Sequence, residues 1–116
     1  MQVKFYCDLY ISENWMNKKR KIMARLQKNR LQPAVYVIAL SQEEQNQLEI
    51  FSAMLMKQHV FDDKELFVVG IADGYLDALY LVEEMTEEAY RETGDADIRR
   101  WILRRQHEYD GTERKY

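Results

Sequence analysis

The chain begins with a regular alternation of side-chain character over residues 2–11. The apolar positions are Val3, Phe5, Cys7, Leu9 and Ile11. The positions between them are Gln2, Lys4, Tyr6, Asp8 and Tyr10. Because successive side chains of a strand point to opposite faces, this pattern predicts a half-buried β-strand with one apolar face.

A pattern with helical spacing follows, between a cap residue at Ser12 and a stop at Asn29 and Pro33. One face of this predicted helix is apolar and carries Trp15, Met16, Ile22, Met23 and Leu26. Another face carries a basic stripe, at spacings of three, four and three residues, made of Lys18, Lys21, Arg25 and Lys28. The segment therefore reads as an amphipathic helix with a basic solvent side.

Two runs, 34–40 and 66–72, are apolar without alternation and rich in β-branched residues. Such runs are typical of strands that are covered on both faces, so we expect them in the centre of a sheet.

Residues 42–58, between these runs, admit two interpretations. Ser41 and Glu44 have the spacing of a capping box, which favours one helix over the whole segment. Alternatively, the residues from Leu48 to Phe51 form the return strand of a hairpin, and a short helix follows from Ser52 to Val60. We favour the hairpin.

The spacing of apolar residues in the last third of the chain predicts two helices. Asp73 is in position to cap the first, and Gly94 is in position to end it. Its inward residues are expected to be Tyr75, Ala78, Leu79, Val82, Met85 and Ala89. Asp95 or Asp97 is expected to cap the second helix, which carries Ile98, Trp101 and Ile102.

These elements predict an α+β fold with a small mixed four-stranded sheet and about three packed helices. If 42–58 is one helix, the alternative is a three-stranded α/β fold in the order β-α-β-α-β-α. We expect residues 1–105 to form a single globular domain, since 116 residues with 47% hydrophobic content suit one core. Residues 106–116 are expected to form a C-terminal tail.

Composition bears on the cellular location of the protein and on its classes of partner. There is one cysteine, no leader pattern at the start and no apolar run long enough for a membrane helix, so we expect a cytoplasmic protein without a membrane partner. The net charge of −3 removes the general positive field that draws proteins onto nucleic acid.

The run from Leu66 to Tyr75, followed by Asp77-Ala78-Leu79 and an acidic helix, resembles short bacterial proteins of unknown function. The resemblance implies a bacterial, uncharacterised family. Its motif is a strand, a turn and a helix, and it assigns no functional residue.

No catalytic, metal-binding or cofactor-binding residue is predicted. His59, His107 and Cys7 are far apart and lack the spacing of metal ligands. The turn from Gly70 to Gly74 matches neither dinucleotide nor P-loop fingerprints, and Asp73 would compete with a phosphate there. A small-substrate pocket at this turn, with Asp73, Asp77 and Tyr75 as its polar groups, is the least favoured hypothesis.

The favoured hypothesis is a non-enzymatic interaction or regulatory module that forms a homodimer or binds a partner protein. If the helices pack on one side of the sheet, then Tyr6, Tyr10 and Tyr36 form an open patch suited to an interface. The competing interpretation is that the last helix closes over this face within the monomer.

The alternative function is nucleic-acid binding through the basic stripe, aided by Arg99, Arg100, Arg104 and Arg105. The acidic run is interpreted as a solvated face or as a site for a basic partner, and it comprises Glu83, Glu84, Glu87 and Glu88.

Overall fold

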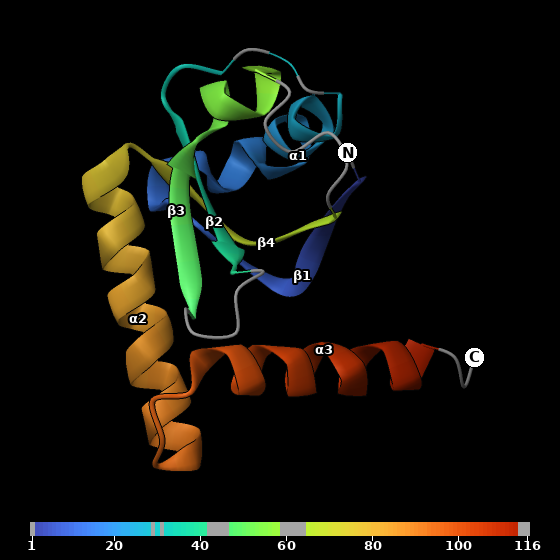
Figure 1. The fold of residues 1–116 in the computed structure, drawn as a ribbon, viewed down its shortest axis with the longest axis vertical. Coiled ribbons are helices and arrows are strands. Elements are labelled where there is room, and N and C mark those ends of the chain that lie inside the picture. Colours follow the sequence, from blue (N-terminus) through green and yellow to red (C-terminus); the bar gives the residue numbers. More distant parts are fainter. Residues whose placement is uncertain (1, 29, 31, 42–46, 59–64, 114–116) are drawn as a thin grey trace.

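The computed structural model describes residues 2–28, 30, 32–41, 47–58 and 65–113. It shows an α+β fold in which one four-stranded mixed sheet carries helices on both faces (Figure 1). The strands lie in the order β1-β4-β2-β3. They are β1 (Gln2–Ile11), β2 (Val35–Leu40), β3 (Leu48–Ser52) and β4 (Glu65–Asp73).

The predicted hairpin is confirmed. Strand β2 pairs with β3 in antiparallel register, with Val37 opposite Phe51 and Leu40 opposite Leu48. The alternative of one helix across 42–58 is wrong, because Leu48–Ser52 is a strand; residues 42–46 lie outside the described part. Strand β4 pairs antiparallel with β2 and parallel with β1.

The helices divide between the two faces of the sheet. Ile22 and Leu26 of α1 pack on one face, whereas α2 and α3 pack on the other. The helical elements are the 3₁₀ helix η1 (Glu13–Lys18), α1 (Lys19–Gln27), the 3₁₀ helix η2 (Ala53–Gln58), α2 (Tyr75–Thr93) and α3 (Ile98–Glu113). The predicted first helix is therefore two elements, and Met16, expected to point inward, lies exposed in η1.

Alternation along the central strands explains the two cores. Val37 and Val68 belong to the core under α1, whereas their neighbours Ile38 and Val69 belong to the core under α2 and α3. All four side chains are fully buried. The two apolar runs are thus central strands covered on both faces, as their pattern predicted.

Gly70 of β4 lies where α2 comes close to the sheet. A Cβ added at this position would lie 2.9 Å from Ile38 Cδ1 and 3.1 Å from Met85 Cε. The missing side chain therefore lets Met85 of α2 pack directly on the strand.

Strand β1 departs from the simple alternation that its sequence predicts. Phe5 is opposite Val68 and Tyr10 is opposite Gly70, so five steps along β1 match only two along β4. Across this irregularity Cys7 joins the same core as Tyr6, rather than the core of Leu9. Both faces of β1 are covered, because α3 packs on the side that the sequence left open.

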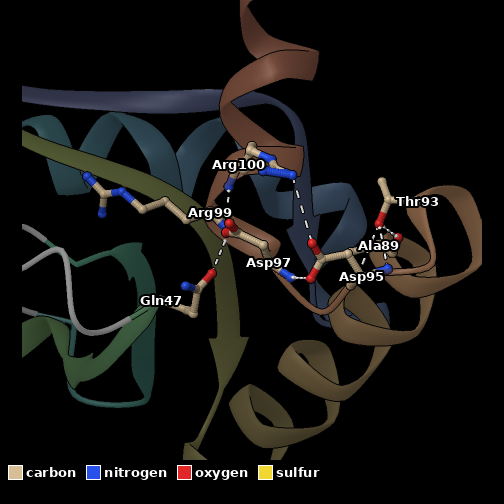
Figure 2. Close-up of polar contacts among 7 residues, drawn as sticks. All are labelled: Gln47, Ala89, Thr93, Asp95, Asp97, Arg99 and Arg100. Atoms are coloured by element: carbon tan, nitrogen blue, oxygen red, sulfur yellow. Dashed lines mark hydrogen bonds and ion pairs between the residues drawn. The ribbon is translucent and has the colours of Figure 1, made fainter.

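The corner between α2 and α3 is fixed by short polar contacts (Figure 2). Gly94 ends α2 in the left-handed conformation, with φ 73°, as its position predicted. Asp97 Oδ1 accepts a hydrogen bond of 3.1 Å from the Arg100 amide, which makes Asp97 the cap of α3. Asp95 Oδ1 in turn accepts one of 3.0 Å from the Asp97 amide.

Ser41 and Gln47, at the two ends of the β2–β3 connection, hold the start of α3 from another side. Gln47 Oε1 accepts a hydrogen bond of 2.9 Å from the Arg99 amide, and the Arg99 guanidinium donates to the Ser41 carbonyl (Figure 2 shows the first contact). These bonds help to set the angle at which α3 crosses the sheet.

Helix α3 continues beyond the point at which the sequence predicted a tail, since residues 106–113 are helical. Gln106 Oε1 accepts a hydrogen bond of 2.7 Å from the Cys7 amide of β1, and its Nε2 donates to Asp110 Oδ1 at 3.0 Å. This contact with β1 anchors the segment and corrects the predicted boundary at 105. Residues 114–116 lie outside the described part.

Candidate functional site

The carboxyl ends of β1 and β4 meet at one edge of the sheet because the two strands are parallel. Ser12, directly after β1, is buried there. Its Oγ donates to Asp77 Oδ2 at 2.5 Å and accepts from the Asp73 amide at 2.8 Å, while its amide donates to the Ile71 carbonyl at 3.1 Å. Ser12 therefore ties together β1, β4 and the first turn of α2. Its side chain does not cap η1, contrary to the predicted role, because these bonds occupy the hydroxyl.

Asp73 does not cap α2 with its side chain either. The cap position is Gly74, with φ 91°, and its amide donates to the Ala34 carbonyl at 3.1 Å. The Asp73 carboxylate instead accepts a hydrogen bond of 2.6 Å from Asn14 Nδ2 of η1. Two of the polar groups that the sequence suggested for a small-substrate pocket, Asp73 and Asp77, thus hold Asn14 of η1 and the adjoining Ser12 against β4 and α2.

An open hollow of about 670 Å³ lies between η1 and the first half of α2. We call it the η1–α2 groove, and it is lined by Ile11, Ser12, Glu13, Asn14, Met16, Asp77, Tyr80, Leu81 and Glu84. Met16 and Tyr80 flank it with 64% and 67% of their surface exposed. Three carboxylates, but no lysine or arginine of the described chain, are among the lining residues.

The side of α2 that faces away from the sheet is unusually apolar. Leu76 is 71% exposed, Tyr80 is 67% exposed and Tyr90 is 62% exposed, and Leu79 is 42% exposed. At 100° per residue these positions share one side of the helix with Glu83 and Glu87. We call this side the outer face of α2.

Two inward assignments on this helix need correction. Leu79 belongs to the outer face, and Tyr75 is half exposed and packs edge-on against Tyr36 with a centroid distance of 5.9 Å. The inward residues are Ala78, Leu81, Met85 and Ala89. The sequence already held the signal for a second apolar stripe, because Leu76, Tyr80 and Tyr90 lie opposite this buried set on a helical wheel.

Helix α2 is strongly acidic, with six carboxylates and one arginine. Glu88 accepts a hydrogen bond from Tyr10, and Glu92 accepts hydrogen bonds from Trp101 and Arg105. Their exposed neighbours Glu83, Glu84 and Glu87 form no ion pair with another described residue. The negative charge that remains is therefore concentrated beside the apolar side chains of the outer face.

The predicted tyrosine patch is not open. Tyr6 is 3% exposed, in one core with Ile98, Trp101 and Ile102 of α3, which is the covering arrangement that the sequence left as the alternative. Its hydroxyl has no hydrogen-bond partner within the described part of the chain, and burial raises its pKa. Burial also raises the pKa of Tyr10, whose hydroxyl donates to Glu88. Tyr36 is half-buried against Tyr75.

The basic stripe lies on the other side of the molecule. Lys18, Lys21, Arg25 and Lys28 are all exposed along η1 and α1, and none pairs with a carboxylate of the described residues. Helices α1 and α3 cover opposite sheet faces, so the arginines of α3 do not extend this stripe (Figure 1).

Arg99, Arg100 and Arg105 of α3 make contacts within the fold, and Arg104 is exposed. Arg105 Nη2 lies 2.5 Å from Asp8 Oδ2, its Nη1 lies 3.4 Å from Glu92 Oε1, and its guanidinium is 5.0 Å from the centre of the Trp101 ring. Arg100 lies 3.8 Å from an Asp95 oxygen. Arg105 therefore links β1, α2 and α3.

The reactive groups give no further site among the described residues. Burial raises the pKa of the Cys7 thiol, which keeps it in the less nucleophilic form. His107 is exposed on α3, and His59 lies outside the described part. The residues that the structure describes contain no group of three metal-binding side chains and no helix that could cross a bilayer.

The fold and the groove define a small α+β domain with an exposed, acidic and apolar helix face. Comparisons with protein-family models, with curated proteins and with solved structures find no match for this chain. The resemblance of 66–79 to short bacterial proteins therefore stays a prediction.

Proposed function

We propose that this chain is a non-enzymatic protein-interaction module that binds its partner through the outer face of α2 and the adjoining η1–α2 groove. The observation that carries the proposal is the exposure of Leu76, Leu79, Tyr80 and Tyr90 on one helix side. Solvent-facing helix positions ordinarily carry polar residues, and several exposed apolar side chains gathered on one face beside polar ones are typical of docking surfaces.

The exposed apolar residues of α3, within its described part, do not form such a face. On α3, Leu103 and Tyr109 are exposed individually, as is common on protein surfaces. The outer face of α2, in contrast, adjoins a groove whose walls include Met16 and Tyr80. Methionine and tyrosine both provide adaptable contact area for a partner.

A homodimer, the arrangement that the sequence favoured, is opposed by charge at this face. Two copies of α2 packed along their outer faces would bring Glu83, Glu84 and Glu87 close to the same residues of the second copy. Like charges at an interface cost binding energy, so a different protein is the favoured partner.

Site-specific photo-crosslinking in the producing cell tests this proposal. A photoreactive phenylalanine analogue at Tyr80 should give a covalent adduct, whereas the same analogue at Leu103 of α3 should give none. The adduct mass, less that of the chain, identifies the partner, and an adduct of twice the chain mass would identify a homodimer. The absence of an adduct at position 80, or equal adducts at both positions, would contradict the proposal.

Nucleic-acid binding through the basic stripe is the second candidate. The four side chains are exposed and without described acidic partners, so they are available to phosphate groups. Binding of labelled single- and double-stranded oligonucleotides at low salt should then weaken as salt rises, and the double substitution Lys21→Glu and Arg25→Glu should weaken it further. No binding at low salt would remove this candidate.

A further inference from the structure

We infer that the segment bound by this module is a basic amphipathic helix, with apolar side chains in the η1–α2 groove and lysines or arginines against the carboxylates of α2. The inference rests on the proposed function and specifies its partner. Shape, charge and the remainder of this chain's own surface each support it.

The groove has the size and lining of an anchor site. Its volume of about 670 Å³ accommodates one or two large side chains. Ile11 and Leu81 are among its lining residues, and the exposed Met16 and Tyr80 stand on its two sides. An apolar side chain from a partner would remove these groups from water, which is the main source of affinity at such a site.

The charge around the groove selects a basic segment. Glu13, Asp77 and Glu84 line it, and Glu83 and Glu87 continue along the outer face. An acidic partner would meet repulsion from all of these groups, whereas lysines and arginines would find Glu83, Glu84 and Glu87, none of which forms an ion pair with a described residue.

The length of the surface suits a helix. The exposed apolar side chains run from Leu76 to Tyr90, which corresponds to about 21 Å along α2 at the rise of an α-helix. A partner helix of about 14 residues covers this distance, with apolar residues on one side and basic residues at its edges.

Helix α1 of a second copy does not offer such a surface. The helix α1 has the necessary basic stripe, but its apolar residues Ile22 and Leu26 are 6% and 1% exposed beneath the sheet. Helix α1 can therefore offer basic side chains to the groove, but its buried Ile22 and Leu26 cannot enter it. A segment of another protein, with both features on one accessible surface, fits the groove better.

A synthetic peptide tests the inference on the full chain. The probe is a fluorescent amphipathic helix of about 18 residues built from leucine and lysine, and its partner probe has glutamate in place of lysine. We expect saturable binding of the lysine peptide by fluorescence anisotropy, weaker at high salt, and no binding of the glutamate peptide.

Matched variants locate the binding. Glu84→Lys should weaken binding of the lysine peptide roughly tenfold, whereas Glu108→Lys, the same change on exposed α3, should weaken it about twofold or less. Tyr80→Ser should also weaken binding, and Tyr109→Ser should not. Circular dichroism confirms that each variant is folded before binding is measured.

Three results would overturn the inference. The first is equal binding of the two peptides, and the second is an equal loss in Glu84→Lys and Glu108→Lys. The third is self-association, seen by sedimentation equilibrium and lost in Tyr80→Ser, which would make a second copy the occupant. All three leave the proposed function intact, because that function depends on the crosslink at position 80.

Discussion

The helices α1 and α2 cover opposite faces of the same sheet and turn very different surfaces toward solvent. Both bury aliphatic side chains against the strands, Ile22 and Leu26 on one side and Leu81 and Met85 on the other. The solvent side of α1 carries lysines and arginines, whereas the outer face of α2 mixes carboxylates with exposed leucines and tyrosines.

The comparison separates the side chains that the fold needs for its core from the side chains that the core does not explain. Inner faces of both helices are accounted for by core packing. The lysines and arginines on the solvent side of α1 need no further explanation, because charged side chains keep a solvent-facing helix surface hydrated. Nothing in the fold requires Leu76 or Tyr80 to be apolar, because both point away from the sheet. Their chemistry is therefore the best indication of a partner.

The largest expected change in stability comes from truncating the buried side chains of α1 and α2, and it tests whether both helices contribute equally to the core. Leu26→Ala in α1 and Met85→Ala in α2 should each lower the free energy of unfolding by about 2–5 kcal/mol, since each side chain is fully buried. Leu76→Ala on the outer face should change it by less than about 0.5 kcal/mol. Urea denaturation measures all three, and a cost of more than 1.5 kcal/mol for Leu76→Ala would show that the outer face is part of the fold.

A smaller effect is expected on the α2 side alone. Gly70→Ala should cost about 1–3 kcal/mol, because its methyl group would meet Ile38 Cδ1 at 2.9 Å and displace Met85. Gly111→Ala in α3, where a methyl group meets nothing within 4 Å, should be neutral or stabilising by up to about 1 kcal/mol. Thermal unfolding of the pair compares them, and equal stability would mean that α2 moves freely away from β4.

The smallest effect concerns the hydroxyl groups beneath α2 and α3. Tyr10→Phe should cost about 0.5–1.5 kcal/mol because the hydrogen bond to Glu88 is lost. Tyr6→Phe should leave stability unchanged or slightly higher, since the Tyr6 hydroxyl has no partner among the described residues. A larger loss for Tyr6→Phe than for Tyr10→Phe would contradict this assignment.

The same two tyrosines predict a dependence on pH. Burial raises the pKa of Tyr6 and of Tyr10 in the folded chain above the ordinary value of 10.0. The folded state therefore retains protons that the unfolded chain releases, so stability is complete below about pH 10 and is lost as pH rises further. Urea denaturation at pH 8 and pH 11 should show this loss, and Tyr6→Phe should reduce it.

Local patterns in the sequence predicted two kinds of element correctly. These are the strands that are buried on both faces and the helix whose end is marked by a glycine. The runs that became β2 and β4 are apolar at every position, and Gly94 ends α2 by its backbone conformation alone. The hairpin was also predicted, because Leu48–Ser52 follows a polar segment and contains β-forming residues.

The predictions were wrong where contacts with residues distant in the sequence determine the role of a side chain or the end of a helix. Ser12 and Asp73 have the chemistry of helix caps, but Asp77 and Asn14 engage their side chains from other elements. Residues 106–113 read as a tail, yet Gln106 binds the Cys7 amide 99 residues away. The side of the sheet chosen by α3, and with it the burial of Tyr6, cannot be read from local periodicity.

The parallel pairing of β1 with β4 has a consequence for synthesis. Strand β1 is made before the other described strands, and its neighbour in the sheet, β4, follows after about 60 residues, or roughly 3–12 s of translation. Strands β2, β3 and β4 lie closer together in the sequence, and β2 pairs antiparallel with both of the others, so these three strands are expected to form a nucleus that β1 joins late. Until then β1 has unpaired amides, which exposes it to capture by a chaperone or by another chain.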